Sequence, residues 1–162
     1  FKPLLRHEAM VFWNKGVGIQ LSHYNLLVNA NGIQHAIDLF EDQTYHINIP
    51  PNSMPWVILQ TMLPLYTGAP LTSDNPDMRL GINEGDFQIR FAWNKLEDTS
   101  PPSLYVCNEN TAFIAMNKMP IHLTALDDDT SPQTITGHSV MMGYLEDALN
   151  EIMFTGNGLK IK

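Results

Sequence analysis

The sequence contains a single cysteine, Cys107, among its 162 residues. One cysteine cannot form an intrachain disulfide, so nothing indicates a secreted scaffold held by disulfides. No apolar stretch reaches the roughly 20 residues that a membrane-spanning helix requires, and no signal peptide is visible. Because the chain begins at Phe1 and not at Met, we expect its start to be processed or truncated.

Positive charge is also scarce. Nine Lys and Arg stand against seventeen Asp and Glu, the formal net charge is −8, and no basic run occurs. We therefore expect neither nucleic acid nor an anionic membrane as a partner. Only 16% of the residues are charged, and the chain contains eleven prolines. This composition is typical of a loop-rich β protein, or of a protein whose surface is largely covered by neighbouring subunits.

Motifs that would identify a cofactor or a catalytic metal are missing. Gly16 and Gly18 lack the remaining spacing of a phosphate-binding loop, so no cofactor is predicted. No two of the six histidines lie closer than eleven residues, whereas metal sites usually use closely spaced pairs. His46 and His122 each fall on the polar face of a predicted strand, and a barrel could bring them together. His35 falls among apolar residues and is predicted to pack in the core or at an interface.

One segment resembles the nucleophile elbow of α/β-hydrolases, Gly137-His138-Ser139-Val140-Met141. That elbow needs a small residue in its fifth position, and its catalytic histidine follows the serine in the chain. Here the fifth position is Met141, and no histidine follows Ser139. We therefore interpret Ser139 as a helix N-cap, and we interpret Cys107, which has no basic neighbour, as a buried thiol. No catalytic residue is predicted.

Two acidic loops contain oxygen ligands of the kind that Ca²⁺ prefers. The weak candidates for such a site are Asp74, Asp77, Asp127, Asp128 and Asp129. Neither loop follows the spacing of an EF-hand, so the simpler interpretation of each is a solvated acidic turn, and no metal site is predicted.

The segment Tyr24–Leu39 contains Asn31-Gly32, a strong signal for a two-residue hairpin turn. If these residues form the turn, residues of even number in the first strand and odd number in the second share a mostly apolar face. A register shift of one residue would mix the two faces, so the pattern predicts a hairpin with one buried face.

The rest of the chain alternates like further short strands. Strands are predicted at 19–30, 33–40, 44–49, 78–82, 87–94, 104–107, 111–117 and 121–126, and with less support at 159–162. The apolar segment Met54–Leu63 fits a strand slightly better than a helix, although Ser53 and Pro55 favour a helix start. Val140–Phe154 has apolar residues at helical spacing and is predicted to be a helix.

These elements predict a mainly β fold, an antiparallel β-sandwich or barrel of about eight short strands with one C-terminal α-helix over about 140–154. Residues 1–162 are expected to form a single domain. Within it, residues 1–13 would form an extended arm or a short helix.

The sequence contains no motif that identifies a family, so the functional hypothesis is built on composition. We expect a non-enzymatic structural protein that forms a symmetric homo-oligomer, specifically a virion component such as a capsid, tail or decoration protein, located in the virion. Its partners would be subunits of its own assembly. One alternative is a ligand-binding module that uses loops 65–76 and 127–136 and that binds carbohydrate or depends on Ca²⁺.

The second alternative is a small hydrolase whose site is assembled from separate strands. Such an enzyme should have a concave pocket that holds at least two of His46, His122, Glu84 and Asp86 within hydrogen-bond reach.

Overall fold

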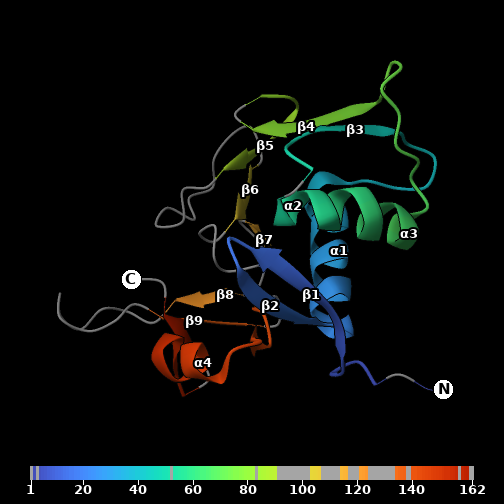
Figure 1. The fold of residues 1–162 in the computed structure, drawn as a ribbon. Coiled ribbons are helices and arrows are strands. Elements are labelled where there is room, and N and C mark those ends of the chain that lie inside the picture. Colours follow the sequence, from blue (N-terminus) through green and yellow to red (C-terminus); the bar gives the residue numbers. More distant parts are fainter. Residues whose placement is uncertain are drawn as a thin grey trace.

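The computed structural model describes residues 2, 4–51, 53–82, 84–90, 103–106, 114–116, 121–123, 134–137, 140–156 and 158–160. Helices and strands both occur along the chain, and the described strands form three small sheets (Figure 1). The elements are β1 (Glu8–Asn14), β2 (Val17–Ser22), α1 (His23–Ile37), β3 (Tyr45–Asn48), α2 (Met54–Val57), the π-helix η1 (Ile58–Met62), α3 (Leu63–Thr67), β4 (Met78–Ile82), β5 (Phe87–Arg90), β6 (Ser103–Val106), β7 (Ile114–Met116), β8 (Ile121–Leu123), β9 (Thr134–Gly137), β10 (Gly143–Tyr144), α4 (Asp147–Met153), β11 (Phe154–Thr155) and β12 (Gly158–Lys160). The fold is therefore mixed α/β, and the predicted antiparallel sandwich or barrel is wrong.

The hairpin of this chain lies earlier than predicted, between β1 and β2. These strands pair antiparallel, with Asn14 opposite Val17. The two turn residues, Lys15 and Gly16, have φ of 50° and 84°. Positive φ at both central residues is what a two-residue turn of type I′ requires. Strand β10 pairs with the other edge of β2 and completes a three-stranded sheet. The strand β1 occupies much of the segment in which an arm or a short helix was expected.

Tyr24–Leu39 is a helix over most of its length, so the predicted hairpin at Asn31-Gly32 is wrong. Helix α1 starts at the N-cap Ser22, whose hydroxyl accepts from the Asn25 N–H while the Asn25 side chain accepts from the Ser22 N–H. This reciprocal pair follows the logic of a capping box. Its buried apolar residues, Leu26, Ala30, Ile33 and Ile37, recur at intervals of four, three and four.

That spacing is a helical stripe, and it accounts for the failure of the hairpin prediction. The same apolar residues also alternate over short distances, and the dipeptide Asn31-Gly32 is typical of a hairpin turn. Glycine in a helix costs about 1 kcal/mol relative to alanine. Burial of several large side chains offsets that cost easily, at roughly 1.5–3 kcal/mol each.

The largest sheet has the strand order β3-β4-β5-β6-β7. Strands β3 to β6 are parallel to their neighbours, and β7 is antiparallel to β6. The predicted strand at 78–82 is confirmed, and β3, β5, β6 and β7 lie within or beside the strands predicted at 44–49, 87–94, 104–107 and 111–117. Their parallel pairing was not predicted.

The second helical segment, Met54–Thr67, contradicts the predicted strand at Met54–Leu63. It runs through α2, η1 and α3. The Ser53 hydroxyl accepts from the Trp56 N–H at 3.4 Å, as the N-cap signal in the sequence indicated. In the π-helix η1, the Leu63 N–H donates to the Ile58 carbonyl, five residues earlier.

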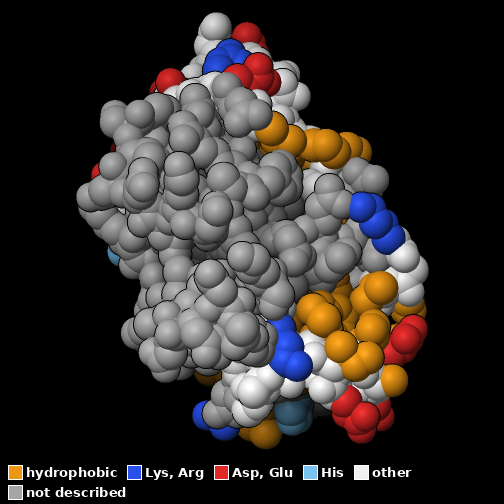
Figure 2. Space-filling view, turned by 90° about the vertical axis from the view of Figure 1, so that its left-hand side faces the viewer, with side chains coloured by type: hydrophobic (Ala, Val, Ile, Leu, Met, Phe, Trp, Pro, Cys, Tyr) orange, Lys and Arg blue, Asp and Glu red, His pale blue; other side chains and the backbone are white. Residues whose placement is uncertain are grey.

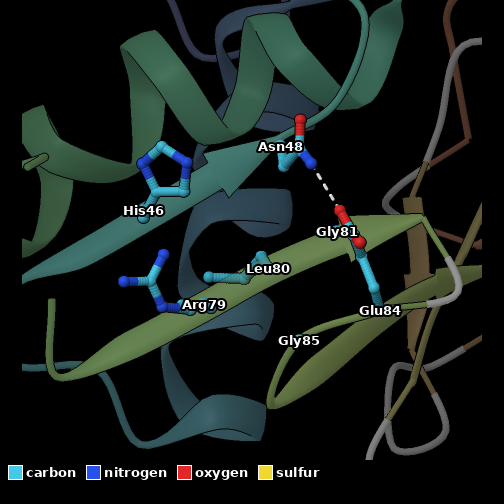
Figure 3. Close-up of a pocket in the computed structure, with 7 residues that line it drawn as sticks. All are labelled: His46, Asn48, Arg79, Leu80, Gly81, Glu84 and Gly85. Carbon is cyan, nitrogen blue, oxygen red and sulfur yellow. Dashed lines mark hydrogen bonds between the residues drawn. The ribbon is translucent and has the colours of Figure 1, made fainter. Parts of the chain in front are cut away.

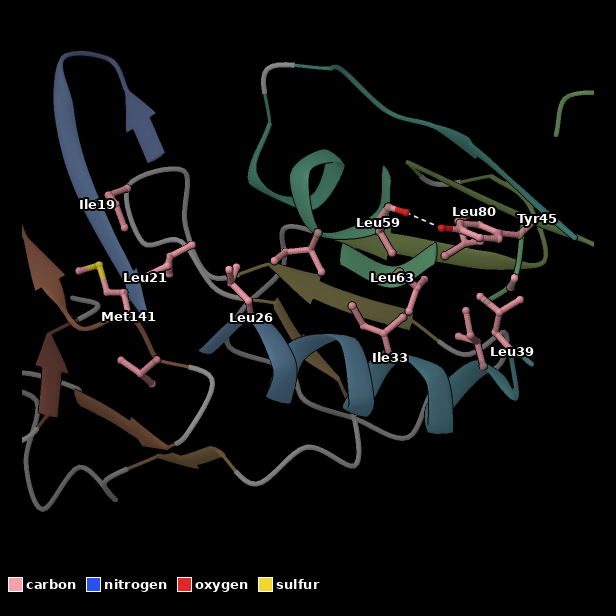
Figure 4. Close-up of a cluster of buried hydrophobic side chains, with 14 of the residues drawn as sticks. Ile19, Leu21, Leu26, Ile33, Leu39, Tyr45, Leu59, Leu63, Leu80 and Met141 are labelled. Carbon is pink, nitrogen blue, oxygen red and sulfur yellow. Dashed lines mark hydrogen bonds between the residues drawn. The ribbon is translucent and has the colours of Figure 1, made fainter. Parts of the chain in front are cut away.

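This π register leaves the carbonyl of Leu59 without a backbone donor. A π-helix would supply the N–H of the fifth residue along, which is Pro64 and has none. The Tyr45 hydroxyl donates to this carbonyl at 2.6 Å instead (Figure 4). Tyr45 is fully buried, and its burial raises the pKa of the phenol well above the usual range. The bond thus joins β3 to the helical layer inside the core.

The hydrophobic core runs from the β1–β2 sheet to the five-stranded sheet, with α1 between them (Figure 4). On the five-stranded sheet, Tyr45 and Leu80 point toward the helices and are buried. The alternate residues of β3 and β4 therefore lie on the opposite face of the sheet. This is the face that holds the candidate site.

The predicted helix over 140–154 is wrong in its first half. The chain forms β10 there, and α4 begins only at Asp147. The Asn150 side chain accepts from the Tyr144 N–H at 2.7 Å and donates to the Tyr144 carbonyl at 2.8 Å, which holds the chain in an extended turn before the helix. Two residues of the predicted apolar stripe, Leu145 and Ile152, are exposed. Figure 2 shows exposed hydrophobic side chains beside acidic ones on one face of the molecule.

Candidate functional site

A cavity of about 300 Å³ lies on the outer face of β3 and β4. It is lined by His46, Asn48, Arg79, Leu80, Gly81, Glu84 and Gly85 (Figure 3). Cavities that hold small molecules usually measure about 300–1,000 Å³, so this one suits a small ligand. Four of its seven lining residues have polar side chains, and these include one acidic and two basic groups.

Strand register brings the basic side chains together. His46 of β3 pairs with Arg79 of β4, and Asn48 pairs with Gly81. Paired residues on adjacent strands project from the same face, with their Cβ atoms about 5 Å apart. Figure 3 shows the His46 ring and the Arg79 guanidinium on the same side of the cavity. Within the described part of the chain, neither side chain makes a hydrogen bond or an ion pair.

The link between β4 and β5 forms the opposite wall of the cavity. Parallel strands are usually joined by a crossover of a dozen or more residues, commonly a helix that covers one sheet face. Here only residues 83–86 separate the two strands. The Asp86 N–H donates to the Arg79 carbonyl at 2.9 Å, and the Arg79 N–H donates to the Asp86 carboxylate at 2.8 Å.

Gly85 lets this link lie close to β4. Its φ is +91°, and a Cβ built there would lie 2.6 Å from the Arg79 carbonyl oxygen. No side chain fits at that distance. The link directs Glu84 back over the sheet, where its Oε1 accepts from the Asn48 amide (Figure 3). The cavity thus has N–H donors at one end and a carboxylate at the other.

The structure brings together some of the residues that the sequence suggested and separates others. His46 and Glu84 line the same cavity, and Asp86 holds the adjacent link. His122 belongs to β8, which pairs in the sheet β11-β12-β9-β8 and not in the sheet that contains His46, and among the described strands no barrel joins the two. His35 is exposed on α1, not packed in a core. Sequence reasoning missed Arg79, although alternation along Met78–Ile82 places it opposite the buried Met78 and Leu80.

The calcium candidates are only partly described. Asp77 Oδ2 accepts from both the N–H and the hydroxyl of Thr44 at 2.8 Å, and these bonds hold the pKa of Asp77 below its usual range. It therefore has a structural partner at the start of β3 and β4. Asp74 is exposed nearby. In the part of the chain that the structure covers, no three His, Cys, Asp or Glu side chains converge on a possible metal position.

Other predicted features lie wholly or partly outside the described residues. These are the remaining calcium candidates Asp127, Asp128 and Asp129, the elbow residues His138 and Ser139, and Cys107. The first residues of the predicted loop 65–76 belong to α3, and most of loop 127–136 is not described. Among the described helices, none is long and apolar enough to cross a membrane.

The arrangement of elements is similar to a portion of several solved structures. No family model matches the chain, and no curated protein sequence matches it. Solved structures do match. The ATP-bound MatB of Rhodopseudomonas palustris superimposes with a TM-score of 0.73 at 10% identity, over 100% of this chain and 46% of that one.

A second similar protein is the o-succinylbenzoate CoA synthetase MenE of Bacillus subtilis in complex with its acyl-adenylate intermediate. It matches with a TM-score of 0.68 at 12% identity, over 98% of this chain and 59% of that one. ATP-bound chimera B3 of RpMatB and BxBclM gives a TM-score of 0.74 at 11% identity. The chain spans about half the length of most of these structures.

This likeness overturns the functional hypothesis drawn from composition. The predicted virion component rested on a β-sandwich, whereas the observed fold is shared with MatB and with the o-succinylbenzoate CoA synthetase MenE. The two alternatives, a binding module built on loops 65–76 and 127–136 and a small hydrolase, are likewise abandoned. Composition misled because few charges and many polar uncharged residues do not distinguish a shell protein from part of a larger enzyme. Assembly into a homo-oligomer stays a prediction.

Proposed function

We propose that the chain is part of an adenylate-forming enzyme that activates a carboxylic acid with ATP. The observation that carries this proposal is the structural match over 98–100% of the chain to MatB and MenE. MatB in that comparison is bound to ATP, and MenE is bound to an acyl-adenylate. Identity of 10–12% is low, so the proposal extends to the reaction class and to no particular acid.

In this reaction a carboxylate oxygen attacks the α-phosphorus of ATP. The new bond joins the acyl oxygen to AMP, and the bond to the bridging oxygen breaks to release pyrophosphate. The protein must therefore hold two anionic reactants close together and stabilise the negative charge of the leaving group. Such sites usually supply backbone N–H groups, Lys, Arg or a metal ion.

The described residues fit only part of that requirement. The β1–β2 turn contains just Lys15 and Gly16, which is too short to wrap around a triphosphate. Arg79 and His46 lie on the sheet without a hydrogen-bond partner among the described residues, yet Glu84 shares their cavity. The triphosphate would thus be held largely by residues outside the described ranges or by another part of the protein. The described residues would thus contribute the fold that supports the site.

Carboxylate-dependent exchange of labelled pyrophosphate into ATP tests the proposal. The assay uses the full-length protein that contains this chain, Mg²⁺ and a panel of aliphatic and aromatic carboxylic acids that includes o-succinylbenzoate. Exchange that requires both ATP and one of the acids supports the proposal. Omission of the acid and replacement of it by the corresponding amide are the matched controls. Absence of exchange with every acid, together with no ATP-induced rise in melting temperature, would overturn it.

One observation favours a second candidate, a protein that keeps this fold without the catalytic reaction. That observation is the tight turn between β1 and β2, which contains only Lys15 and Gly16 and does not form a phosphate-binding loop. Such a protein would show neither pyrophosphate exchange nor stabilisation by ATP. The same assay therefore separates the two candidates.

A further inference from the structure

We propose that the cavity on β3 and β4 binds a small polyhydroxy carboxylate, independently of the proposed reaction with ATP. The polar side chains of the cavity lie on the sheet face opposite the helical layer, since His46, Asn48 and Arg79 alternate with the buried Tyr45 and Leu80 along β3 and β4.

The basic end is suited to a carboxylate. A guanidinium presents several N–H donors in a planar fork that matches the two oxygens of a carboxylate. An imidazole can donate from a ring nitrogen whichever tautomer it adopts. Arg79 and His46 lie side by side in register and have no partner within the described residues. A carboxylate placed between them would accept from both.

The acidic end is suited to hydroxyl groups. Glu84 Oε1 accepts from the Asn48 side chain, and this bond fixes the carboxylate over the sheet. Its second oxygen, Oε2, makes no hydrogen bond within the described part of the chain and is free to accept from a ligand hydroxyl. A carboxylate only accepts, so the ligand group that meets it must donate.

The balance of charge selects a carboxylate over a phosphate. Arg79 supplies one positive charge and Glu84 one negative charge in the same cavity. A carboxylate places its single charge beside Arg79 and its hydroxyls beside Glu84. A phosphate monoester carries nearly two negative charges at neutral pH, and Glu84 repels the additional charge.

Calorimetric titration with gluconate tests this proposal, with three probes built on the same carbon chain as controls. Sorbitol keeps the hydroxyls, hexanoate keeps the carboxylate, and sorbitol phosphate exchanges the carboxylate for a phosphate. We expect gluconate to bind in the millimolar range or tighter, about tenfold better than each of the others, as loss of a charge-assisted hydrogen bond predicts. The NMR signal of the His46 ring should shift with gluconate and stay unchanged with sorbitol.

Variants separate this site from nonspecific attraction. Arg79→Gln should weaken gluconate binding about tenfold, whereas Arg6→Gln, which removes an exposed cation elsewhere, should leave it unchanged. Glu84→Gln should improve the relative binding of sorbitol phosphate. An unchanged melting temperature in each variant shows that folding is intact. Equal binding of gluconate and sorbitol, no binding of gluconate, or normal binding by Arg79→Gln would each overturn the proposal, whatever the pyrophosphate assay shows.

Discussion

Replacing Tyr45 by Phe should expose the energetic consequence of the π-helix. The Tyr45 hydroxyl is the donor to the Leu59 carbonyl, which Pro64 leaves without a backbone partner. Removal of that hydroxyl leaves a buried carbonyl unsatisfied, at a cost of about 1–3 kcal/mol. For a domain of this size, each kcal/mol lowers the melting temperature by about 2–4 °C. Urea unfolding should therefore show a clear loss of stability in Tyr45→Phe.

A double-mutant cycle tests the stated cause. Pro64→Ala restores the backbone N–H of residue 64, so that the Leu59 carbonyl gains a donor in the π register. In that background, Tyr45→Phe should cost at least about 1 kcal/mol less than in the wild-type chain. Tyr66→Phe is the matched control, because the Tyr66 side chain is exposed and its hydroxyl accepts a hydrogen bond from the exposed Asn31. It should change stability by less than about 0.5 kcal/mol. The reasoning fails if Tyr45→Phe costs the same with and without Pro64.

Three further predictions concern pH and backbone strain. Burial raises the pKa of Tyr45 in the folded state. The protonated phenol therefore stabilises the fold fully below the unfolded pKa of about 10, and this stabilisation declines as the pH rises further. Tyr45→Phe should flatten the fall in urea midpoint at alkaline pH. Hydrogen bonds lower the pKa of Asp77 in the folded state. The ionised carboxylate therefore stabilises the fold above about pH 4, and this stabilisation is lost as the pH falls through the folded-state pKa. Asp77→Asn should flatten the decline of stability at acid pH, and an unchanged decline would contradict this. Gly85→Ala should destabilise the protein more than Gly16→Ala. Both glycines have positive φ, which costs an alanine about 1 kcal/mol, but only at Gly85 would the Cβ also meet a carbonyl oxygen at 2.6 Å. Equal melting temperatures of the two variants would refute the close approach.

Local patterns predicted some strands well and the helices poorly. The alternation in 44–49 and 78–82 matches β3 and β4, because each strand has one buried face and one open face. Tyr24–Leu39 was misassigned because its apolar residues fit both periods, and only packing against the sheet decides between them. The type I′ turn that was expected at Asn31-Gly32 occurs at Lys15-Gly16, where the flanking strands β1 and β2 can pair.

The candidate site was predictable in part. His46 and Glu84 were identified as residues that a pocket could combine, and they line the same cavity. Arg79 was not identified, because its pairing with His46 depends on a parallel register between strands more than thirty residues apart. Short-range patterns do not specify such a register. In the sequence, residues 83–86 are typical of an ordinary turn. Only the fold shows that this short link joins two parallel strands and leaves one face of the sheet uncovered by a helix.

Transfer of oxygen-18 from a carboxylic acid to AMP tests the central proposal most directly. The measurement uses the full-length protein, an acid labelled in its carboxylate, ATP, and coenzyme A or hydroxylamine to cleave the adenylate. If the protein forms an acyl-adenylate, a labelled oxygen remains on the phosphorus, and mass spectrometry will find it in the released AMP. If ATP is merely hydrolysed, or not consumed at all, no label will appear in AMP, and the assignment to adenylate-forming enzymes would be contradicted.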